Sequence, residues 1–216
     1  MTDGSAPRGT AGYAAEAERL VSQYESIAFA EIHAAILPLL PAPPADVLDI
    51  GAGTGRDAAG FAALGYRVTA VEPTLELRRQ AVLLHPSPRI EWVDDGLPDL
   101  AALSGRGESF DVVMLTAVWM HLDEAERRCA MPRLARLMRV GAVMALSLRH
   151  GPVPEGRRMF DVSAAETIDL ARGCGLRCLL CRTDDDALLG RSGVTWDRIA
   201  FVREAAQGLH APEAIA

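Results

Sequence analysis

Apolar strand-like runs alternate with helical segments through most of this chain, and the alternation limits its folds more than any other feature. Continuous apolar strands separated by helices form a parallel sheet that helices cover on both faces, with right-handed crossovers. Two apolar runs near the end predict a terminal antiparallel pair. We therefore expect an α/β, doubly wound, mostly parallel seven-stranded sheet. The expected strands are 47–50, 68–71, 90–93, 110–115, 142–148, 176–183 and 194–202, and the expected helices are 55–64, 74–84, 98–104, 123–139 and one within 163–176.

The ends of the chain follow a different pattern. Apolar residues near a 3.6-residue period predict a helix over 14–40, which the prolines from Pro41 onward end. Pro132 is expected to kink the helix over 123–139 or to divide it in two. The acidic residues 184–186 are expected to form the loop of the terminal strand pair. We expect one domain over 1–216, with an N-terminal helical cap at about 10–44, a core at about 45–203 and a frayed tail at 204–216.

The charged residues exclude several chemistries. All 22 basic residues are arginine, and neither lysine nor asparagine occurs. A Walker-type phosphate loop and a Schiff-base enzyme both need lysine, so neither is possible. The net charge of −7 and the scattered arginines argue against nucleic acid as a partner. Without a signal peptide or a long apolar segment, the chain is expected to be cytoplasmic, with no membrane partner.

The stretch VLDIGAGTGR indicates what the sheet binds. Gly51, Gly53 and Gly55 follow the first expected strand and open a helix, where the backbone must turn sharply and approach a ligand closely. Their spacing differs from the dinucleotide fingerprint G-x-G-x-x-G, in which Arg56 would occupy the place of the third glycine. Glu72 ends the second expected strand, 21 residues after Gly51, where a carboxylate accepts hydrogen bonds from both ribose hydroxyls. The pattern favours a bound ribose over a bound pyrophosphate.

The succession of DIGAGTGR, VEP and a strand ending in Asp-Asp resembles the class I S-adenosylmethionine-dependent methyltransferases over roughly residues 45–203. The resemblance implies a Rossmann-like methyltransferase fold, S-adenosyl-L-methionine as cofactor, and a small-molecule acceptor. It also implies that the N-terminal cap folds over the cofactor and that one of Asp94 and Asp95, preferably Asp95, accepts a hydrogen bond from the adenine amino group. The cofactor-binding residues it implies are Asp49, Gly51, Ala52, Gly53, Gly55, Glu72, Pro73, Asp94, Asp95, Gly96, Leu115, Thr116 and Tyr24.

Methyl transfer from a sulfonium is an in-line displacement in which the protein mainly aligns the reactants and excludes water, so no metal is expected. An acceptor hydroxyl needs a base near neutral pH, and the candidates are His121 and His150, just beyond the fourth and fifth expected strands. The arginine-rich segment 149–160 is a candidate substrate lid that would suit an anionic acceptor. The candidate acceptor-binding residues are Trp119, Arg149, Arg157 and Arg158.

Other functions remain open at this point. A reductase using NAD(P) would share the fold, and a catalytically silent homologue would bind S-adenosylmethionine without turnover. Cys174, Cys178 and Cys181 have the C-x₃-C-x₂-C spacing of radical S-adenosylmethionine enzymes, a remote alternative because these thiols straddle a helix end and an expected buried strand. Arg56 either pairs with the methionine carboxylate of the cofactor or lies exposed. The sequence leaves open the acceptor, the atom that is methylated and the oligomeric state.

Overall fold

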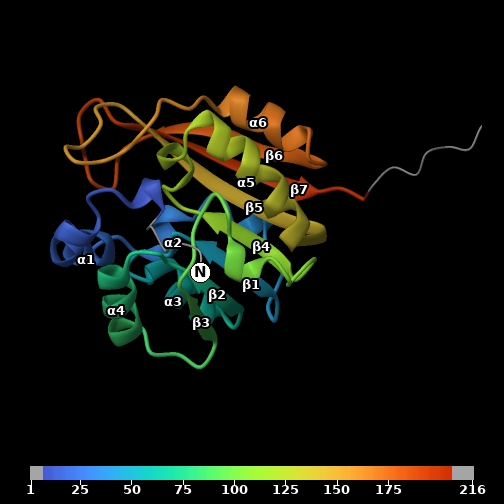
Figure 1. Ribbon diagram of the computed structural model, residues 1–216, viewed down its shortest axis with the longest axis horizontal. Helices are drawn as coiled ribbons and strands as arrows, with labels where there is room; N and C mark the ends of the chain where they lie inside the picture. The colour runs from blue at the N-terminus through green and yellow to red at the C-terminus, as the bar shows by residue number, and fades with distance from the viewer. Residues whose placement is uncertain (1–6, 206–216) are drawn as a thin grey trace, which may run out of the picture.

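Seven strands form a sheet in the order β3-β2-β1-β4-β5-β7-β6 in the computed structural model, which describes residues 7–205 (Figure 1). The first five strands are parallel, and β7 runs antiparallel to β5 and β6. The doubly wound α/β fold and its terminal antiparallel pair are thereby confirmed. The strands are β1 (Asp46–Ile50), β2 (Arg67–Val71), β3 (Ile90–Val93), β4 (Phe110–Leu115), β5 (Met138–His150), β6 (Leu176–Asp185) and β7 (Thr195–Arg203).

Helices cover both faces of this sheet. Successive residues of β1 show why: Val47 is buried in a cluster with Phe61 on one face, and Leu48 in a cluster with Leu134 on the other. Side chains alternate along a strand, so both faces of a parallel sheet need an apolar cover. The helices are α1 (Ala17–Glu25), α2 (Phe29–Ile32), α3 (Arg56–Leu64), α4 (Leu75–Leu84), α5 (Glu124–Leu137) and α6 (Ala164–Arg172), with short 3₁₀ turns η1 (Arg8–Thr10), η2 (Ala14–Glu16), η3 (Leu37–Leu39), η4 (Ala101–Leu103) and η5 (Trp119–His121).

The N-terminal segment is not the single helix expected over 14–40. It is divided into η2, α1, α2 and η3, and Ala28 between the two α-helices is extended. Tertiary contacts explain the division: the Phe29 ring packs edge-on against Phe61 at 4.9 Å, and His33 binds the Asp57 carboxylate at the start of α3. Both contacts follow the break at Ala28, so the segment after α1 packs on α3 instead of continuing the α1 helix.

Three further boundaries differ from expectation. α5 runs unbroken through Pro132, so it is not two helices. β5 is longer than 142–148 because it begins directly at the end of α5, with an irregular register near Phe110. Asp184 and Asp185 belong to β6, so only the last of the three acidic residues lies beyond the strand.

The tail expected to fray at 204–216 lies mostly outside the described residues, but Glu204 N–H still donates to the Gly175 carbonyl (3.0 Å). Within residues 7–205, no helix is both long and apolar enough to cross a membrane.

The two edges of the sheet are short or irregular. β3 has four residues, and β6 loses its regular register with β7 between Cys178 and Leu180. The strand expected to bury the cysteines is thus an edge strand, on which Cys181 is exposed.

Candidate active site

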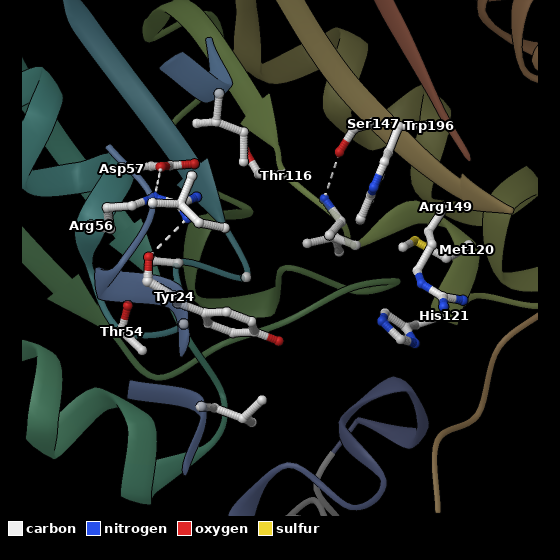
Figure 2. Close-up of a pocket in the computed structure, with 18 of the residues that line it drawn as sticks. Tyr24, Thr54, Arg56, Asp57, Thr116, Met120, His121, Ser147, Arg149 and Trp196 are labelled. Atoms are coloured by element: carbon white, nitrogen blue, oxygen red, sulfur yellow. Dashed lines mark hydrogen bonds and ion pairs between the residues drawn. The ribbon is translucent and has the colours of Figure 1, made fainter. Parts of the chain in front are cut away.

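A cavity of about 760 Å³ lies at the carboxyl ends of β1, β2, β4 and β5, bordered by the N-terminal segment. Small-molecule sites commonly measure about 300–1,000 Å³. Figure 2 shows two groups of side chains on opposite sides of it, with the Tyr24 hydroxyl between them. One group, the glycine-loop half, consists of Asp49, Gly51–Thr54, Arg56, Asp57, Glu72–Thr74, Gly96 and Thr116. The other, the histidine half, consists of Tyr13, Met120, His121, Ser147, Arg149, Arg157 and Trp196.

The glycine loop reaches the cavity because its backbone adopts conformations that side chains would block. Gly51 and Gly53 have φ values of +67° and +58°, and both line the cavity with Ala52. A Cβ on Gly51 would lie 2.5 Å from a Val118 methyl group. Gly55, also left-handed, does not line the cavity; its N–H closes the turn onto Ala52, and its Cα faces the Trp92 ring. It serves the turn that starts α3.

Glu72 ties this loop to the end of β2. Its carboxylate accepts hydrogen bonds from Gly53 N–H (2.8 Å) and Thr74 N–H (2.7 Å) while buried at the cavity wall. Burial raises the pKa of Glu72, and the two backbone donors oppose that rise. A carboxylate has about four lone-pair positions, so two remain for a ligand hydroxyl.

Asp49 and Thr116 present polar atoms to the same half without partners. Asp49 Oδ2 and Thr116 Oγ1 are buried and find no hydrogen bond within residues 7–205. Burial raises the pKa of Asp49 well above its usual value, and the nearby Asp57 and Glu72 carboxylates raise it further. A buried carboxylate with a free oxygen suits a cationic ligand group, which would favour its ionised form.

Arg56 and Asp57 link the cavity to the N-terminal segment. Arg56 donates to Asp57 (2.8 Å) and to the Tyr24 carbonyl (3.2 Å) (Figure 2). Asp57 also binds His33 (2.8 Å). Arg56 is therefore not an exposed first-turn arginine. Burial alone would raise the pKa of Asp57, but the charges and hydrogen bonds of His33 and Arg56 outweigh it and lower the pKa.

The third sequence element lies differently from its expected place. Asp94 turns outward to Arg78 (2.6 Å), and Asp95 accepts from Gly96 N–H and Ala102 N–H (both 2.8 Å), so both carboxylates organise the loop after β3 rather than line the cavity. Gly96 lines it, as does Pro73. Leu115 is fully buried in the sheet and also lies outside it.

In the histidine half, both His121 ring nitrogens are occupied. Nδ1 lies 2.7 Å from the Arg158 carbonyl and Nε2 lies 2.9 Å from the Tyr13 hydroxyl. A carbonyl accepts only, so Nδ1 carries the proton and Nε2 accepts from the phenol. Burial lowers the pKa of His121, with the Arg157 and Arg158 charges adding to the effect.

Two more of the expected residues lie outside the cavity. His150 pairs with Asp197 (2.9 Å) and contacts Asp161 (3.4 Å) beside the antiparallel strands. Trp119 has no exposed surface and is buried in the larger core cluster, so it does not line the cavity.

The three candidate acceptor arginines separate into two kinds. Arg149 and Arg157 line the cavity, and each keeps one buried nitrogen, Nε and Nη1 respectively, without a partner within residues 7–205. Arg158 instead pairs with Asp123 (2.7 Å) and Glu126 (2.6 Å). Its role is to fix the 151–163 segment against α5.

Sequence reasoning missed Tyr13 and the residues that follow β6. Tyr13 lies within the expected cap, but only the folded chain brings it to His121. Asp186 accepts from Trp196 Nε1 (2.8 Å) and Arg191 Nε (2.7 Å), which places the indole at the cavity wall. The acidic stretch predicted a loop, and no spacing in the sequence indicated that residues after β6 would line the cavity.

The cysteines do not form a cluster site. No group of three histidine, cysteine, aspartate or glutamate side chains within residues 7–205 is placed to hold a metal ion. Cys178 donates to the Leu180 carbonyl (3.4 Å) at the β6 irregularity, and Cys181 points to solvent on the edge strand. Both thiols lie on β6, away from the glycine loop.

Comparison with known proteins agrees with the fold. A family model described as a methyltransferase domain matches residues 47–141. Uncharacterized methyltransferases of Mycobacterium bovis and Mycobacterium tuberculosis are 32% identical over 115 residues, covering 50% of this chain and 41% of the relative. The chain therefore spans less than half the length of these relatives.

Two solved structures share the architecture. The 1,6-didemethyltoxoflavin-N1-methyltransferase of Burkholderia thailandensis, with its substrate and S-adenosylhomocysteine bound, superposes with a TM-score of 0.68 at 20% identity, over 89% of this chain and 84% of that one. The magnesium protoporphyrin IX methyltransferase of Synechocystis PCC 6803, with S-adenosylmethionine bound, gives 0.61 at 17% identity, over 89% and 85%.

Proposed function

We propose that this chain, which carries a class I S-adenosylmethionine-dependent methyltransferase domain of Rossmann-like fold, transfers a methyl group from S-adenosylmethionine to a small-molecule acceptor. One observation carries the proposal most. The buried Glu72 carboxylate binds the glycine loop at the end of β2, beside the unpartnered Asp49 oxygen. One half of the cavity therefore holds a hydrogen-bond acceptor for ribose hydroxyls and a partner for a cationic group.

The residues present fit the cofactor. Asp49 Oδ2 would accept from its ammonium group, and the free lone pairs of Glu72 would accept from the ribose hydroxyls. Pro73 and Gly96 would border the adenine, with backbone rather than the Asp94 or Asp95 side chain facing it. The proposal keeps the loop contacts implied by the sequence and moves the adenine contact to the chain around Gly96.

The cofactor supplies a methyl group on a positively charged sulfur; the acceptor atom bonds to that carbon as the sulfur–carbon bond breaks, and the electron pair stays on sulfur. The protein's work is then positioning and exclusion of water. Tyr24, whose hydroxyl stands between the two halves, orients the ligands (Figure 2). The contact of Arg56 with the Tyr24 carbonyl holds α1 over the glycine loop.

The acceptor we propose carries a negative charge. Arg149 and Arg157 both line the histidine half with a free nitrogen, while Trp196 and Met120 offer apolar surface. Buried guanidinium groups with a free nitrogen bind carboxylates or phosphates strongly. Arg149 is the better placed of the two, because Arg157 is also paired with Glu16 (2.7 Å).

The deciding experiment is a calorimetric titration of S-adenosylhomocysteine into the protein, with NAD as a comparison ligand. We expect the wild type to bind the homocysteine compound and not NAD. Glu72→Ala should weaken binding by about 100-fold, because two charge-assisted hydrogen bonds are lost and the loop loses its anchor. Glu76→Ala, an exposed carboxylate two positions into α4, should bind within about twofold of the wild type.

Binding of NAD instead, or no binding of S-adenosylhomocysteine by folded protein, would overturn the proposal. Transfer is then tested with labelled S-adenosylmethionine and small carboxylates and phosphates, each beside its uncharged ester. Arg149→Gln should raise the KM of the charged acceptors about tenfold and leave that of the esters unchanged. The matched control is Arg128→Gln, which removes an exposed ion pair on α5.

A further inference from the structure

We infer that Tyr13 contacts the methyl acceptor and passes the acceptor's proton to His121, so that the two residues form one proton-transfer unit. The inference rests on the proposed function and adds a residue and an acceptor class to it. The contact joins residues 108 positions apart, Tyr13 on the N-terminal segment and His121 in η5, and both line the cavity.

The hydrogen bonds of His121 decide which residue meets the acceptor. Nδ1 must donate to the Arg158 carbonyl, so Nε2 carries the only free lone pair, and the Tyr13 hydroxyl fills it. An acceptor cannot reach either ring nitrogen unless it displaces Tyr13. The Tyr13 oxygen, in contrast, keeps a lone pair for a proton from the cavity. A base at His121 therefore acts through the phenol.

Two contacts hold the Tyr13 ring in this position, and a third fixes one of its partners. The His121 ring meets it edge-on, with centroids 5.6 Å apart, and the Arg157 guanidinium lies 4.0 Å over its face. Glu16 fixes that guanidinium from one turn further along the N-terminal segment (2.7 Å). The phenol is thus oriented by the same segment that closes the cavity.

The charge states suit a relay. Burial raises the pKa of Tyr13, with Tyr24 adding to the rise and Arg157 opposing it, so the phenol stays protonated at neutral pH. Burial lowers the pKa of His121, so its imidazole is free to accept. For each methyl gained, the acceptor atom loses one proton to the Tyr13 oxygen while the Tyr13 proton moves to Nε2. The neighbouring Arg157 and Arg158 charges then favour release of that proton from the imidazolium.

A relay of this kind is needed only for some acceptors. A carboxylate oxygen that receives a methyl group has no proton to lose, whereas a hydroxyl or an ammonium group does. We therefore assign the acceptor to small anions that carry a separate hydroxyl or amine, with the charge at Arg149 and the protic group at Tyr13.

The first measurement needs no acceptor. In protein labelled with ¹⁵N-histidine and loaded with S-adenosylhomocysteine, His121 should show a protonated Nδ1 and an unprotonated Nε2, assigned by the loss of these signals in His121→Gln. Tyr13→Phe should shift the Nε2 resonance. Tyr66→Phe is the matched control, because its hydroxyl donates to the Pro41 carbonyl far from the site, and it should leave the resonance unchanged.

The second measurement is kinetic. Small carboxylates bearing a phenol, an alcohol or an amine are compared with the parent acids that lack these groups, and only the former should be methylated. Tyr13→Phe and His121→Gln should each lower kcat by about 100-fold or more, and the double variant should lose no more than the single ones, because both act in one step. The KM for S-adenosylmethionine should stay within about twofold.

An Nε2 resonance that Tyr13→Phe leaves in place overturns the inference. So does a Tyr13→Phe variant with wild-type kcat, losses that multiply in the double variant, or methylation of the parent acids at equal rate. Failure of the wild type to bind S-adenosylhomocysteine is a separate result, which removes the proposed function itself.

Discussion

The two halves of the cavity are built in opposite ways. In the glycine-loop half, the anchoring hydrogen bond joins Gly53 to Glu72 across 19 positions, within one strand–helix–strand unit. In the histidine half, the contact between Tyr13 and His121 spans 108 positions, and that between Glu16 and Arg157 spans 141. One half is encoded in a short stretch of chain, and the other exists only once distant segments have packed.

This difference predicts how each half responds to substitution. The glycine-loop half depends on backbone conformations and buried carboxylates, so single changes there should abolish a whole binding site. The histidine half depends on side chains from several segments, so single changes should alter one contact and leave cofactor binding intact.

Gly51→Val should have the largest effect. Gly51 has φ +67°, and its Cβ would lie 2.5 Å from a Val118 methyl group. A β-branched residue in a left-handed conformation costs about 1–3 kcal/mol before any clash, so we expect S-adenosylhomocysteine affinity to fall by about 100-fold in calorimetry. Gly105→Val, where nothing lies within 4 Å of the added Cβ, should bind normally. Wild-type affinity in Gly51→Val would contradict the claim that the glycine-loop half depends on its backbone conformation.

Asp186→Ala tests the other half. It removes the acceptor of Trp196 Nε1 and Arg191 Nε, leaving the indole N–H and the guanidinium without their partner. The free energy of unfolding should fall by about 1–3 kcal/mol in urea titrations. S-adenosylhomocysteine affinity should remain within about twofold. Asp185→Ala, an exposed neighbour, should change neither quantity, and a large loss of cofactor affinity in Asp186→Ala would show that the halves are coupled.

Cofactor binding should also depend on pH through Asp49. Its raised pKa means that the free protein holds a proton there at acidic pH, whereas a bound ammonium group favours the ionised form. Below the raised pKa of Asp49, binding therefore releases a proton. As pH falls through that pKa, affinity should fall by a total of about tenfold for each unit by which binding lowers it. Calorimetry in two buffers with different ionisation enthalpies measures the release, which should vanish in Asp49→Asn. Equal heats for the wild type in both buffers would contradict the assignment.

Cys181→Ser should have the smallest effect. The thiol is exposed on an edge strand and outside both halves. We expect a change in unfolding free energy within about 0.5 kcal/mol and unchanged S-adenosylhomocysteine affinity. Iron bound by the wild-type protein and lost in this variant, measured by metal analysis, would instead support the cysteine-cluster alternative.

The same contrast explains what the sequence could predict. Periodicity located every strand of the sheet, and the glycine spacing with Glu72 located one half of the cavity, because these features are local in the chain. The break at Ala28 was not visible, since the contact of Phe29 with Phe61 decides it. Asp95 could not be distinguished from a loop-organising carboxylate, because its partner Ala102 N–H depends on how the loop folds.

For the histidine half, the sequence supplied candidates without their arrangement. His121 and Arg149 were identified by their positions after strands, which place them at the correct edge of the sheet. His150 was an equal candidate by that argument, but it is adjacent to Arg149 on β5, and the alternation of side chains turns it toward Asp197. Tyr13 carried no signal, because its role depends on a partner more than a hundred residues away.

The irregular edge of the sheet bears on how this protein behaves in concentrated solution. An exposed edge strand offers unpaired backbone groups to other chains, and natural proteins counter that hazard with short strands, charges and bulges. β3 has only four residues, while β6 carries both the break at Cys178–Leu180 and the charged pair Arg182 and Asp184. Neither edge presents a long flat template, so strand addition leading to aggregation is disfavoured at both ends of the sheet.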